Sequence, residues 1–517
     1  MTRKILKAFY LTVFSLLLFC LFSVFVSARG INAPGGEVTN TDELIMALGG
    51  SEAAELIEDK ILLKDDITLA SAVSIASGSY VIEGGDCAVY KGFLGGEMFS
   101  VSSGASLTFG TENGENRSGT LVLSNEENGK DDSGCILNVK GSLTVYYGTV
   151  IRTESEKAIV SDGNASFYGL YIENAPCPIY NTGVMALVGC EFENCSGEKG
   201  GVIISSGTLS ASACKFTNCS AKSGGVILNE GTAVMAICEF TDCTSEEEGG
   251  AVLNYKDYTD KGGRYIGCSS LNGGVISNYG NAEFAQVYIN KCTAEKNGGC
   301  AYNNGALALG PEGYIDECSA TENGGGIYND KEGEITYNGP MISANTAKYG
   351  GGIFNLGFLE HLSGCMTMNK AEAGAAVLNA GRISYKGSPV VEDSNDVFIL
   401  LSDSSGKLGD EHAISVDGPI TAPNTATLSC GTESNGVYKK KLSNGAVLLK
   451  GEYADQKYGA FFVEGGKGKV GADGKLSGIF PVALIIIISA SVIIIAAVAI
   501  LLLVFRKRKK NAERNSL

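Results

Sequence analysis

One stretch near the middle of the chain decides the fold: residues 224–254 read GGVILNEGTAVMAICEFTDCTSEEEGGAVLN. The stretch opens with Gly224-Gly225, passes through a short apolar run to Asn229, and returns to a glycine pair at Gly249-Gly250 after two cysteines. Glycine adopts positive φ at no steric cost. Each glycine pair therefore predicts a sharp corner that runs into a strand of three or four residues.

The same cassette recurs along the chain. Read at the Asn position, successive copies are 24, 24, 25, 24, 25, 26, 26 and 24 residues apart. The copies place this position at Asn181, Ser205, Asn229, Asn254, Asn278, Asn303, Asn329, Asn355 and Asn379. Helical repeats have longer periods and the Leu-rich horseshoe signature is missing, so the cassette predicts a parallel β-helix with one coil per repeat.

A single coil cannot bury its inner face, so neighbouring coils must stack about 4.8 Å apart and carry identical residues in ladders. Weaker coils extend the series toward the N-terminus at Ile159–Ser161, Ile136–Asn138 and Met98–Ser100. The expected fold is all-β: a single-stranded, right-handed parallel β-helix of about twelve rungs, on the order of 60 Å long.

Both ends of the predicted stack need a cap, because an open strand edge can pair with another molecule. Thr41–Leu48 reads as a short helix over the first coil, with Thr41 or Asp42 accepting the first free helix N–H groups. Strand-like runs at Val397–Leu401 and Ala446–Leu449 are expected to close the far end.

The two ends of the chain carry membrane signals. Basic residues, an apolar run and Val26-Ser27-Ala28 predict an export signal, with an uncleaved signal anchor as the alternative. Val482–Phe505 is about 36 Å long as a helix, enough to cross a bilayer, and the basic run that follows places the C-terminus in the cytoplasm. We therefore expect a single-pass protein of the plasma (cell) membrane with an extracellular ectodomain.

These patterns divide the chain into segments of distinct character. They are 1–28 signal peptide, 29–95 N-terminal cap and first coils, 96–384 β-helix repeats, 385–464 C-terminal coils and cap, 465–479 Gly-rich stalk, 480–505 transmembrane helix and 506–517 basic tail.

The expected ectodomain is strongly acidic. Without the signal and the tail, 31 of the 40 basic and 56 of the 57 acidic residues remain, a net charge of about −25. Nucleic acid is excluded as a partner, since phosphate binding depends on Lys and Arg. The charge favours either a cationic partner or plain solubility of a Gly-rich surface.

Most of the cysteines form two columns. One column holds Cys195, Cys219, Cys243, Cys268, Cys292 and Cys318, and the other Cys190, Cys214 and Cys238. Their spacing fits either small core residues or disulfides between rungs. A metal site needs clustered ligands, and no CxxC and almost no His are present, so neither metal nor cofactor is expected.

The repeats resemble those of the polymorphic outer-membrane protein family, pectate-lyase-like β-helical surface proteins that carry Gly-Gly-Ala-(Ile/Val/Leu) and Phe-x-x-Asn motifs. The Phe motif stands at Phe192–Cys195, Phe216–Cys219 and Phe240–Cys243, with Cys in the place of Asn. Asn returns at Asn345 and Asn369, so Cys and Asn share one column. The resemblance implies surface adhesion. The chain departs from the family at its C-terminal end, where one apolar segment and a basic tail stand.

β-Helices also carry polysaccharide lyases and hydrolases, so an enzyme is the alternative. Paired carboxylates facing one groove are not evident, and Arg152, Arg264 and Arg382 stand without neighbouring Asp clusters. His361 reads as an ordinary exposed or hydrogen-bonded histidine. We therefore expect no catalysis.

Irregular loops are the best candidates for ligand binding, because insertions lie outside a stacked core. Two qualify: residues 124–134, and Tyr255–Lys261, which is expected to expose Tyr255 and Tyr258. The alternative is a neutral insertion. The predicted function is a membrane-anchored, non-catalytic surface rod with an adhesin-like or structural role toward an extracellular protein or glycan. The alternative is a surface polysaccharide lyase, hydrolase or sugar-binding protein.

Overall fold

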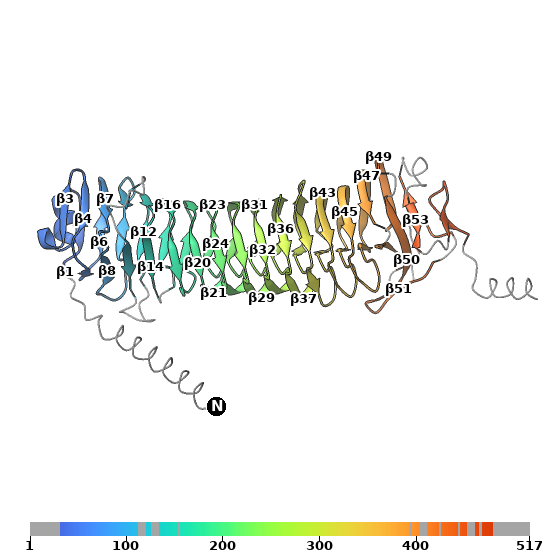
Figure 1. Ribbon diagram of the computed structural model, residues 1–517, viewed down its shortest axis with the longest axis horizontal. Helices are drawn as coiled ribbons and strands as arrows, with labels where there is room; N and C mark the ends of the chain where they lie inside the picture. Colours follow the sequence, from blue (N-terminus) through green and yellow to red (C-terminus); the bar gives the residue numbers. More distant parts are fainter. Residues whose placement is uncertain are drawn as a thin grey trace, which may run out of the picture.

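The computed structural model describes residues 31–478 except 112–119, 126–133, 154–155, 393, 403–410, 423–424, 443–444, 452–460 and 465–467. The described chain winds into a parallel β-solenoid of about 13 turns, drawn out as a rod (Figure 1). The predicted parallel β-helix is confirmed, with a coil number close to the twelve expected. No helix of the described part is long and apolar enough to cross a membrane. The predicted spans at 1–28 and 480–505 lie outside the described residues.

Successive coils pair in parallel, so that each side of the solenoid is a sheet. The first side, which we call the Asn sheet, consists of β2 (Gly36–Val38), β6 (Val73–Ile75), β9 (Phe99–Val101), β12 (Leu137–Val139), β15 (Ile159–Ser161), β18 (Ile179–Asn181), β22 (Ile203–Ser205), β26 (Ile227–Asn229), β30 (Val252–Asn254), β34 (Ile276–Asn278), β38 (Ala301–Asn303), β42 (Ile327–Asn329), β44 (Ile353–Asn355), β46 (Val377–Asn379), β48 (Val397–Ser402), β50 (Ala426–Ser434) and β53 (Phe461–Val463), with β51 (Val437–Lys440) antiparallel to β50.

The second side follows the Asn sheet along each coil. Its strands are β4 (Lys60–Leu63), β7 (Ser79–Glu83), β10 (Ser106–Phe109), β13 (Ser142–Val145), β16 (Asn164–Tyr168), β19 (Val184–Val188), β23 (Thr208–Ser212), β27 (Thr232–Ala236), β31 (Asp257–Lys261), β35 (Asn281–Ala285) and β39 (Ala306–Leu309), with β3 (Ala54–Ile57) antiparallel to β4.

The third side consists of β1 (Ile31–Ala33), β5 (Ile67–Leu69), β8 (Ala88–Lys91), β11 (Leu121–Ser124), β14 (Thr149–Arg152), β17 (Tyr171–Glu173), β20 (Glu191–Glu193), β24 (Lys215–Thr217), β28 (Glu239–Thr241), β32 (Arg264–Ile266), β36 (Tyr288–Asn290) and β40 (Tyr314–Asp316). From β43 (Glu334–Ser343) on, one bent strand spans the second and third sides, because it pairs with both β39 and β40. The next coils pair on β43 in turn through the long strands β45 (Phe358–Thr367) and β47 (Arg382–Val391), followed by the shorter strands β49 (Ile414–Ile420) and β52 (Leu449–Lys450).

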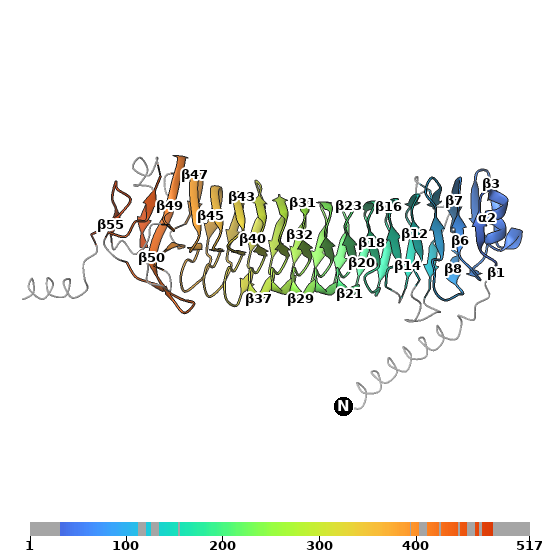
Figure 2. The same ribbon diagram turned by 180° about the vertical axis from the view of Figure 1, so that it is seen from behind.

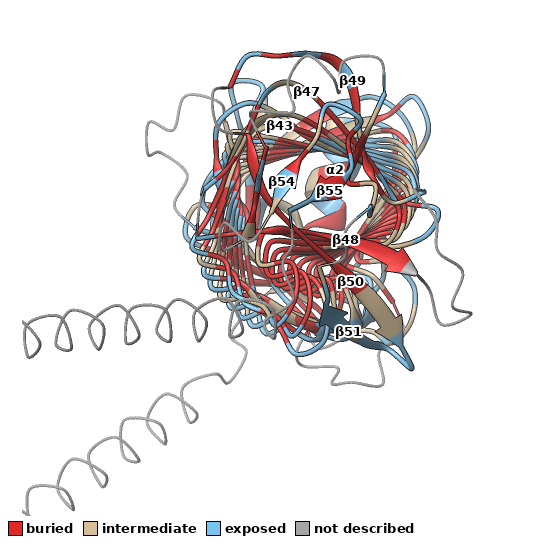
Figure 3. Ribbon diagram, turned by 90° about the vertical axis from the view of Figure 1, so that its right-hand side faces the viewer, coloured by how far each residue is buried: buried red, intermediate tan, exposed pale blue. Residues whose placement is uncertain are grey.

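A short fourth side closes the middle coils. It holds β21 (Ser196–Lys199), β25 (Ser220–Ser223), β29 (Thr244–Glu248), β33 (Ser269–Asn272), β37 (Thr293–Asn297) and β41 (Ser319–Ala320). Burial alternates along the strands of the second side, as in β27, which buries Ala233 and Met235 and exposes Thr232 and Val234. Seen along the axis, the coils lie one behind another, and the buried segments of successive coils line up along the strands (Figure 3).

The inward residues form ladders that hold the coils together. The rings of Phe192, Phe216, Phe240 and Tyr265 stack one above the next with centroids 5.2, 4.8 and 4.5 Å apart. Offset or parallel ring contacts at this distance add to the burial of apolar area. The stacked aromatic rings therefore support the register of four successive coils on the third side, from β20 to β32.

The two glycines of each corner do different things. Gly224 has φ +65°, which L side chains rarely adopt. Gly225 does not have positive φ, but a Cβ there would collide with the carbonyl oxygen of Gly250 one coil on. The first glycine of a pair thus makes the turn, and the second lets neighbouring coils approach.

Helix α2 (Thr41–Ala47) covers the N-terminal end of the rod (Figure 2). Its N-cap is Asn40, whose Oδ1 accepts from the Glu43 N–H at 2.9 Å, while the Glu43 carboxylate accepts from Thr39 N and Oγ1 at 2.7 Å. The prediction that Thr41 or Asp42 caps the helix is wrong by one residue, because Asn40 is the last extended residue. A 3₁₀ turn, η1 (Gly50–Glu52), follows.

The C-terminal end differs in part from the predicted stalk. Within 465–479, β54 (Lys469–Val470) and β55 (Leu476–Ser477) form a small antiparallel hairpin. Val470 and Leu476 are buried against the last coil. Two apolar side chains among the glycines are enough to dock this segment on the core.

Candidate binding surface

The predicted Asn ladder lies inside the solenoid. Each Asn Nδ2 before Asn379 donates to the side-chain oxygen at the same position one coil on, and each Asn of the ladder is at most 1% exposed. The distances are 3.0 Å for Asn181–Ser205, 2.7 Å for Asn229–Asn254, 2.8 Å for Asn254–Asn278, 2.8 Å for Asn278–Asn303, 2.8 Å for Asn303–Asn329, 2.7 Å for Asn329–Asn355 and 2.6 Å for Asn355–Asn379. The ladder is therefore structural and closed to ligands.

Each ladder amide also secures the corner that follows it. The Nδ2 of Asn254 donates to the carbonyl oxygens of Lys256 at 3.0 Å and Asn281 at 3.1 Å. The last member, Asn379, donates to the His412 carbonyl at 2.7 Å. Buried amides that satisfy their donors in this way specify one register of stacking.

The main cysteine column lies at another inner corner, directly after a residue in the left-handed conformation. Each Sγ approaches the carbonyl oxygen two residues earlier, and in the middle coils also a carbonyl of the preceding coil, as Cys243 does at 3.5 Å to Thr241 and 3.4 Å to Phe216. The cysteines of the described residues are all free thiols, so the structure has the core-filling alternative and not the disulfides. Burial raises the pKa of the Cys243 and Cys292 thiols.

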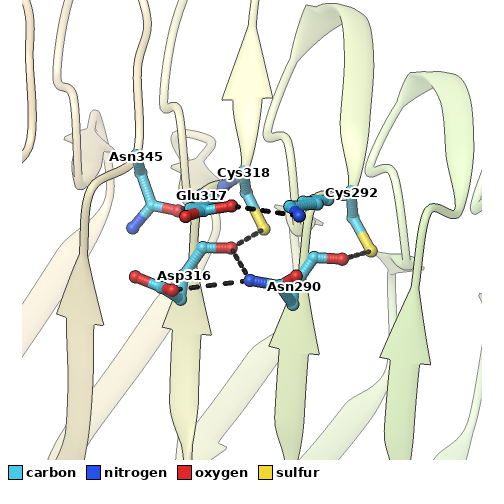
Figure 4. A network of polar contacts seen from close by, with 7 residues as sticks. Asn290, Cys292, Asp316, Glu317, Cys318 and Asn345 are labelled. Atoms are coloured by element: carbon cyan, nitrogen blue, oxygen red, sulfur yellow. Dashed lines mark hydrogen bonds and ion pairs between the residues drawn. The ribbon is translucent and has the colours of Figure 1, made fainter.

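The column changes from Cys to Asn after Cys318. Asn345 Nδ2 donates to Ile315 O at 2.9 Å and to Asn369 Oδ1 at 3.0 Å, and Asn345 Oδ1 accepts from Cys318 N at 2.9 Å. Figure 4 shows Cys292, Cys318 and Asn345 on successive coils. Asn395 continues the column by accepting from Asn369 at 3.0 Å, and the sequence period missed it because its coil lacks the Phe-x-x-Asn motif.

The outer side of the same corner carries polar contacts between coils. Asn290 Nδ2 lies 3.4 Å from Asp316 Oδ2 (Figure 4). Lys291 pairs with Glu317 at 3.6 Å. Such exposed pairs contribute little each. Aligned side chains of neighbouring coils therefore contact each other on the outer surface of this corner as well as on its inner surface.

His361 is neither exposed nor hydrogen-bonded, contrary to the prediction. It is fully buried between Tyr337, 4.4 Å away by ring centroids, and Tyr385, 4.9 Å away, and neither ring nitrogen has a partner. Burial lowers its pKa to about 3, so the ring is neutral and occupies a position that aromatic side chains fill in the adjacent coils.

Of the two tyrosines predicted to be exposed, Tyr258 is 1% exposed. Residues 257–261 form strand β31, and Tyr258 points inward in the column of Ala233 and Ala282, whose small side chains leave room for it. Its hydroxyl lies 2.7 Å from that of Tyr265, which donates to Asp260 Oδ2 at 2.5 Å. Burial raises the pKa of Asp260 to about 7.

Tyr255 is 44% exposed and begins a row of aromatic rings on the outside of the solenoid. We call Tyr255, Tyr279, Tyr302 and Tyr328 the tyrosine stripe; their centroids follow one another at 5.5, 6.0 and 5.3 Å. Tyr255 and Tyr279 directly follow ladder asparagines, while Tyr302 and Tyr328 directly precede them, so the stripe runs along the Asn sheet. The spacing of the asparagines was visible in the sequence. The tyrosines were not recognised as one row, because two of them follow the ladder asparagine and two precede it.

Carboxylates border the stripe. The Tyr279 hydroxyl donates to Glu248, and the Tyr302 hydroxyl donates to Asp330 Oδ2 at 2.5 Å. Burial raises the pKa of both hydroxyls. No ion pair within the described ranges uses Glu248 or Asp330. The stripe therefore presents ring edges and negative charge together.

The chain itself covers the C-terminal end of this row. Tyr328 stacks on Phe354 at 5.4 Å, and Tyr438 of β51 packs across Phe354 at 5.6 Å with ring planes 78° apart. Tyr438 also meets Tyr349 at 5.0 Å and 70°. The aromatic row is thus covered over its last coils and open over the stripe.

A second concave feature lies near the same end of the rod. A cleft of about 600 Å³ is lined in part by Lys331, Arg382, His412, Asp417 and Lys450. His412 Nδ1 lies 2.9 Å from the Gly381 carbonyl oxygen, to which it donates. In the sequence, Arg382 has no neighbouring Asp cluster. Asp417 joins it in the lining of the cleft because their two coils stack on each other.

Across the described part of the chain, no group of three or more His, Cys, Asp or Glu side chains is arranged to hold a metal ion. Most of the predicted loop 124–134, residues 126–133, lies outside the described residues. No protein-family model, no curated protein and no solved structure matches this chain. The likeness to polymorphic outer-membrane repeats therefore stands on the motifs alone.

Proposed function

We propose that the protein is a membrane-anchored rod of the cell surface that makes adhesive contacts and catalyses no reaction, with the tyrosine stripe as its contact surface. The stripe, in which Tyr255 is exposed and Tyr279, Tyr302 and Tyr328 are half-buried, carries the proposal. Tyrosine is a frequent anchor in protein interfaces because it offers apolar area and a polar tip. The right-handed winding and the kinship with polymorphic outer-membrane repeats belong to the same proposal.

The scaffold suits such a role. A ladder of buried amides and a stack of aromatic rings connect each coil to the next, so a contact made at one end is presented at a fixed distance from the other. The acidic surface limits association with nucleic acid and anionic lipid and leaves cationic surfaces as partners.

The test is adhesion of living cells that express the full chain. Cells with the intact protein should lose it to external protease and should attach to at least one of a panel of coated cell-surface proteins and glycans. A chain ending at residue 479 should appear in the medium instead of on the cells. Failure to reach the surface, or attachment equal to that of cells without the protein, would refute the proposal.

The cleft supports a second candidate, a sugar-active or sugar-binding site. Arg382, Lys331 and Lys450 supply positive charge on an acidic rod, and His412 and Asp417 supply groups able to move a proton. Arg382 lies over the Phe358 ring at 5.1 Å. Incubation with acidic polysaccharides, with and without calcium, should then release reducing ends or unsaturated products, and Arg382→Ala should abolish the release. The absence of any product would leave the non-catalytic rod.

A further inference from the structure

The covered end of the aromatic row shows which side chain this surface accepts. Tyr438 lies across Phe354 and Tyr349 with its ring nearly perpendicular to theirs. Phe354 and Tyr349 are each only 3% exposed, so they belong to a buried cluster together with Leu378 and Phe398. An aromatic residue from a β-strand is thus the natural cover of this row.

The covering strand is basic as well as aromatic. Residues 436–441 read GVYKKK. Lys440 Nζ pairs with Asp396 at 3.1 Å and with Glu464 at 2.7 Å, and the Asp396 side chain is nearly buried. One short segment therefore combines a ring laid on aromatic residues with an ammonium group laid on carboxylates.

The tyrosine stripe repeats the receiving half of this arrangement without a cover. Tyr255 stacks on Tyr279 and Tyr302 on Tyr328, while Tyr279 and Tyr302 are tilted by 47°, so the ring faces are largely occupied by neighbouring rings and a further ring can approach their edges. Ring edges carry partial positive charge and attract the negative face of a further ring, as in the perpendicular contacts of Tyr438. Glu248 and Asp330 accept from the hydroxyls of Tyr279 and Tyr302 and supply negative charge at the stripe, as Asp396 and Glu464 supply it to Lys440 of the covering strand.

We propose that the tyrosine stripe binds an extended peptide segment of a partner protein in which an aromatic residue is followed by lysine or arginine. The inference rests on the proposed adhesive function and names the class of partner. Two features favour this occupant over an apolar one: the carboxylates within the stripe, and an excess of acidic over basic residues in the whole chain, 57 against 40. That excess would attract a basic segment before contact.

The first test uses the chain's own cover as a probe. A fluorescent peptide of sequence Gly-Val-Tyr-Lys-Lys-Lys is titrated with the full-length protein in detergent, and binding is followed by anisotropy. We expect saturable binding that weakens as salt is added, because exposed charges are screened. Peptides with Ala in place of Tyr, or Glu in place of the lysines, should each bind at least about tenfold more weakly.

The second test locates the site. Tyr279→Ala with Tyr302→Ala should weaken peptide binding at least about tenfold, since two ring contacts are lost. The matched control is Tyr288→Ala with Tyr314→Ala, which removes two tyrosines, 41% and 44% exposed, from the third side. Glu248→Gln with Asp330→Asn keeps the ring stack and should reduce both affinity and salt dependence, so a folding defect of the first variant leaves the proposal testable.

Three results would overturn the inference. The probe peptide does not bind, the stripe and control variants lose the same amount of peptide affinity, or the peptide with Glu in place of the lysines binds as tightly as the probe. If cells expressing the protein still adhere in that case, the adhesive function stands and only the partner class is wrong. If the cells adhere to nothing, the adhesive function itself falls, whatever the peptide does.

Discussion

Asn345 Nδ2 lies 2.9 Å from the carbonyl oxygen of Ile315, three residues before Cys318, and Cys219 Sγ meets the carbonyl of Phe192, three residues before Cys195, in the same way. The thiol and the amide therefore serve one acceptor at one corner of the solenoid. They differ in what they offer the next coil, because the amide has a second donor and a strong acceptor and the thiol has neither.

This difference predicts unequal effects of two cysteine substitutions. Cys318→Asn should shift the unfolding free energy by less than about 1 kcal/mol, because Asn345 lies next in the column and supplies the partner oxygen. Cys243→Asn should cost about 1–3 kcal/mol, since both of its column neighbours are thiols and one amide donor stays buried without a partner. Thermal unfolding of both variants, followed by circular dichroism, decides; equal melting temperatures would contradict the prediction.

Asn278→Ala should be among the most destabilising single changes. It removes a fully buried amide that donates to Asn303 and accepts from Asn254, and it leaves their groups unpaired, at a cost of about 3 kcal/mol. Asn281→Ala is the control: the Asn281 side chain is exposed and donates to Asp257 on the surface, and its backbone contacts are kept in the variant, so the change should cost less than about 0.5 kcal/mol. Chemical denaturation measures both, and similar midpoints would show that the ladder adds no stability.

Asp260 should make the rod less stable as the pH rises. Burial raises its pKa from 3.8 to about 7 in the folded protein, so the folded state holds a proton that the unfolded chain releases. The favourable contribution is complete below about pH 4 and is lost as the pH passes through 7. Asp260→Asn should flatten the melting temperature between pH 5 and 8, and an unchanged slope would refute the assignment.

His361 should make the rod less stable as the pH falls, the opposite of the effect of Asp260. Its pKa is lowered from 6.5 to about 3 by burial, so stability is lost as the pH falls below 6.5, where the unfolded chain takes up a proton and the folded one does not. His361→Phe removes two buried unpaired nitrogens and keeps a ring between Tyr337 and Tyr385. We expect stabilisation of about 1 kcal/mol or more at pH 5 and less at pH 8, from melting curves at both.

Ile237 is a strained corner that can be relieved. Its φ is +54°, a conformation unfavourable for β-branched residues, and the aligned positions hold Ala213 in the preceding coil, Gly189 in the coil before that and Gly262 in the following coil, all at positive φ. Ile237→Gly should stabilise the protein by up to about 1 kcal/mol, because the left-handed penalty exceeds the entropic cost of glycine. Val234→Gly, in the adjoining strand, should instead lower the melting temperature.

The fold was predictable because its signal repeats. A glycine pair and an inward Asn every coil fix the turn, the close approach and the amide ladder, so Asn229 and Gly225 could be assigned from spacing alone. The buried tyrosine was missed, because Tyr258 looks like part of a polar insertion until its inward column is seen to hold alanines. Side-chain direction follows strand register, and register in that coil is set by its neighbours.

The candidate surface was only half visible in the sequence. Tyr255 was identified as exposed, but its continuation through Tyr279, Tyr302 and Tyr328 was not, because the row changes from one side of the ladder asparagine to the other. Arg382 and Asp417 likewise lie on neighbouring coils and far apart in sequence. Relationships that depend on packing between coils, and not on the period itself, needed the structure.

The amide ladder has a direction: from Asn229 to Asn379 each Nδ2 points to the following coil and each Oδ1 to the preceding one. Any coil in this series can therefore follow any other without leaving a mismatched donor or acceptor in the amide ladder. Duplication or excision of one repeat in the gene would lengthen or shorten the rod by a single step and leave this ladder continuous. Reach is then a property that evolution can adjust in units of one coil, independently of what the rod displays.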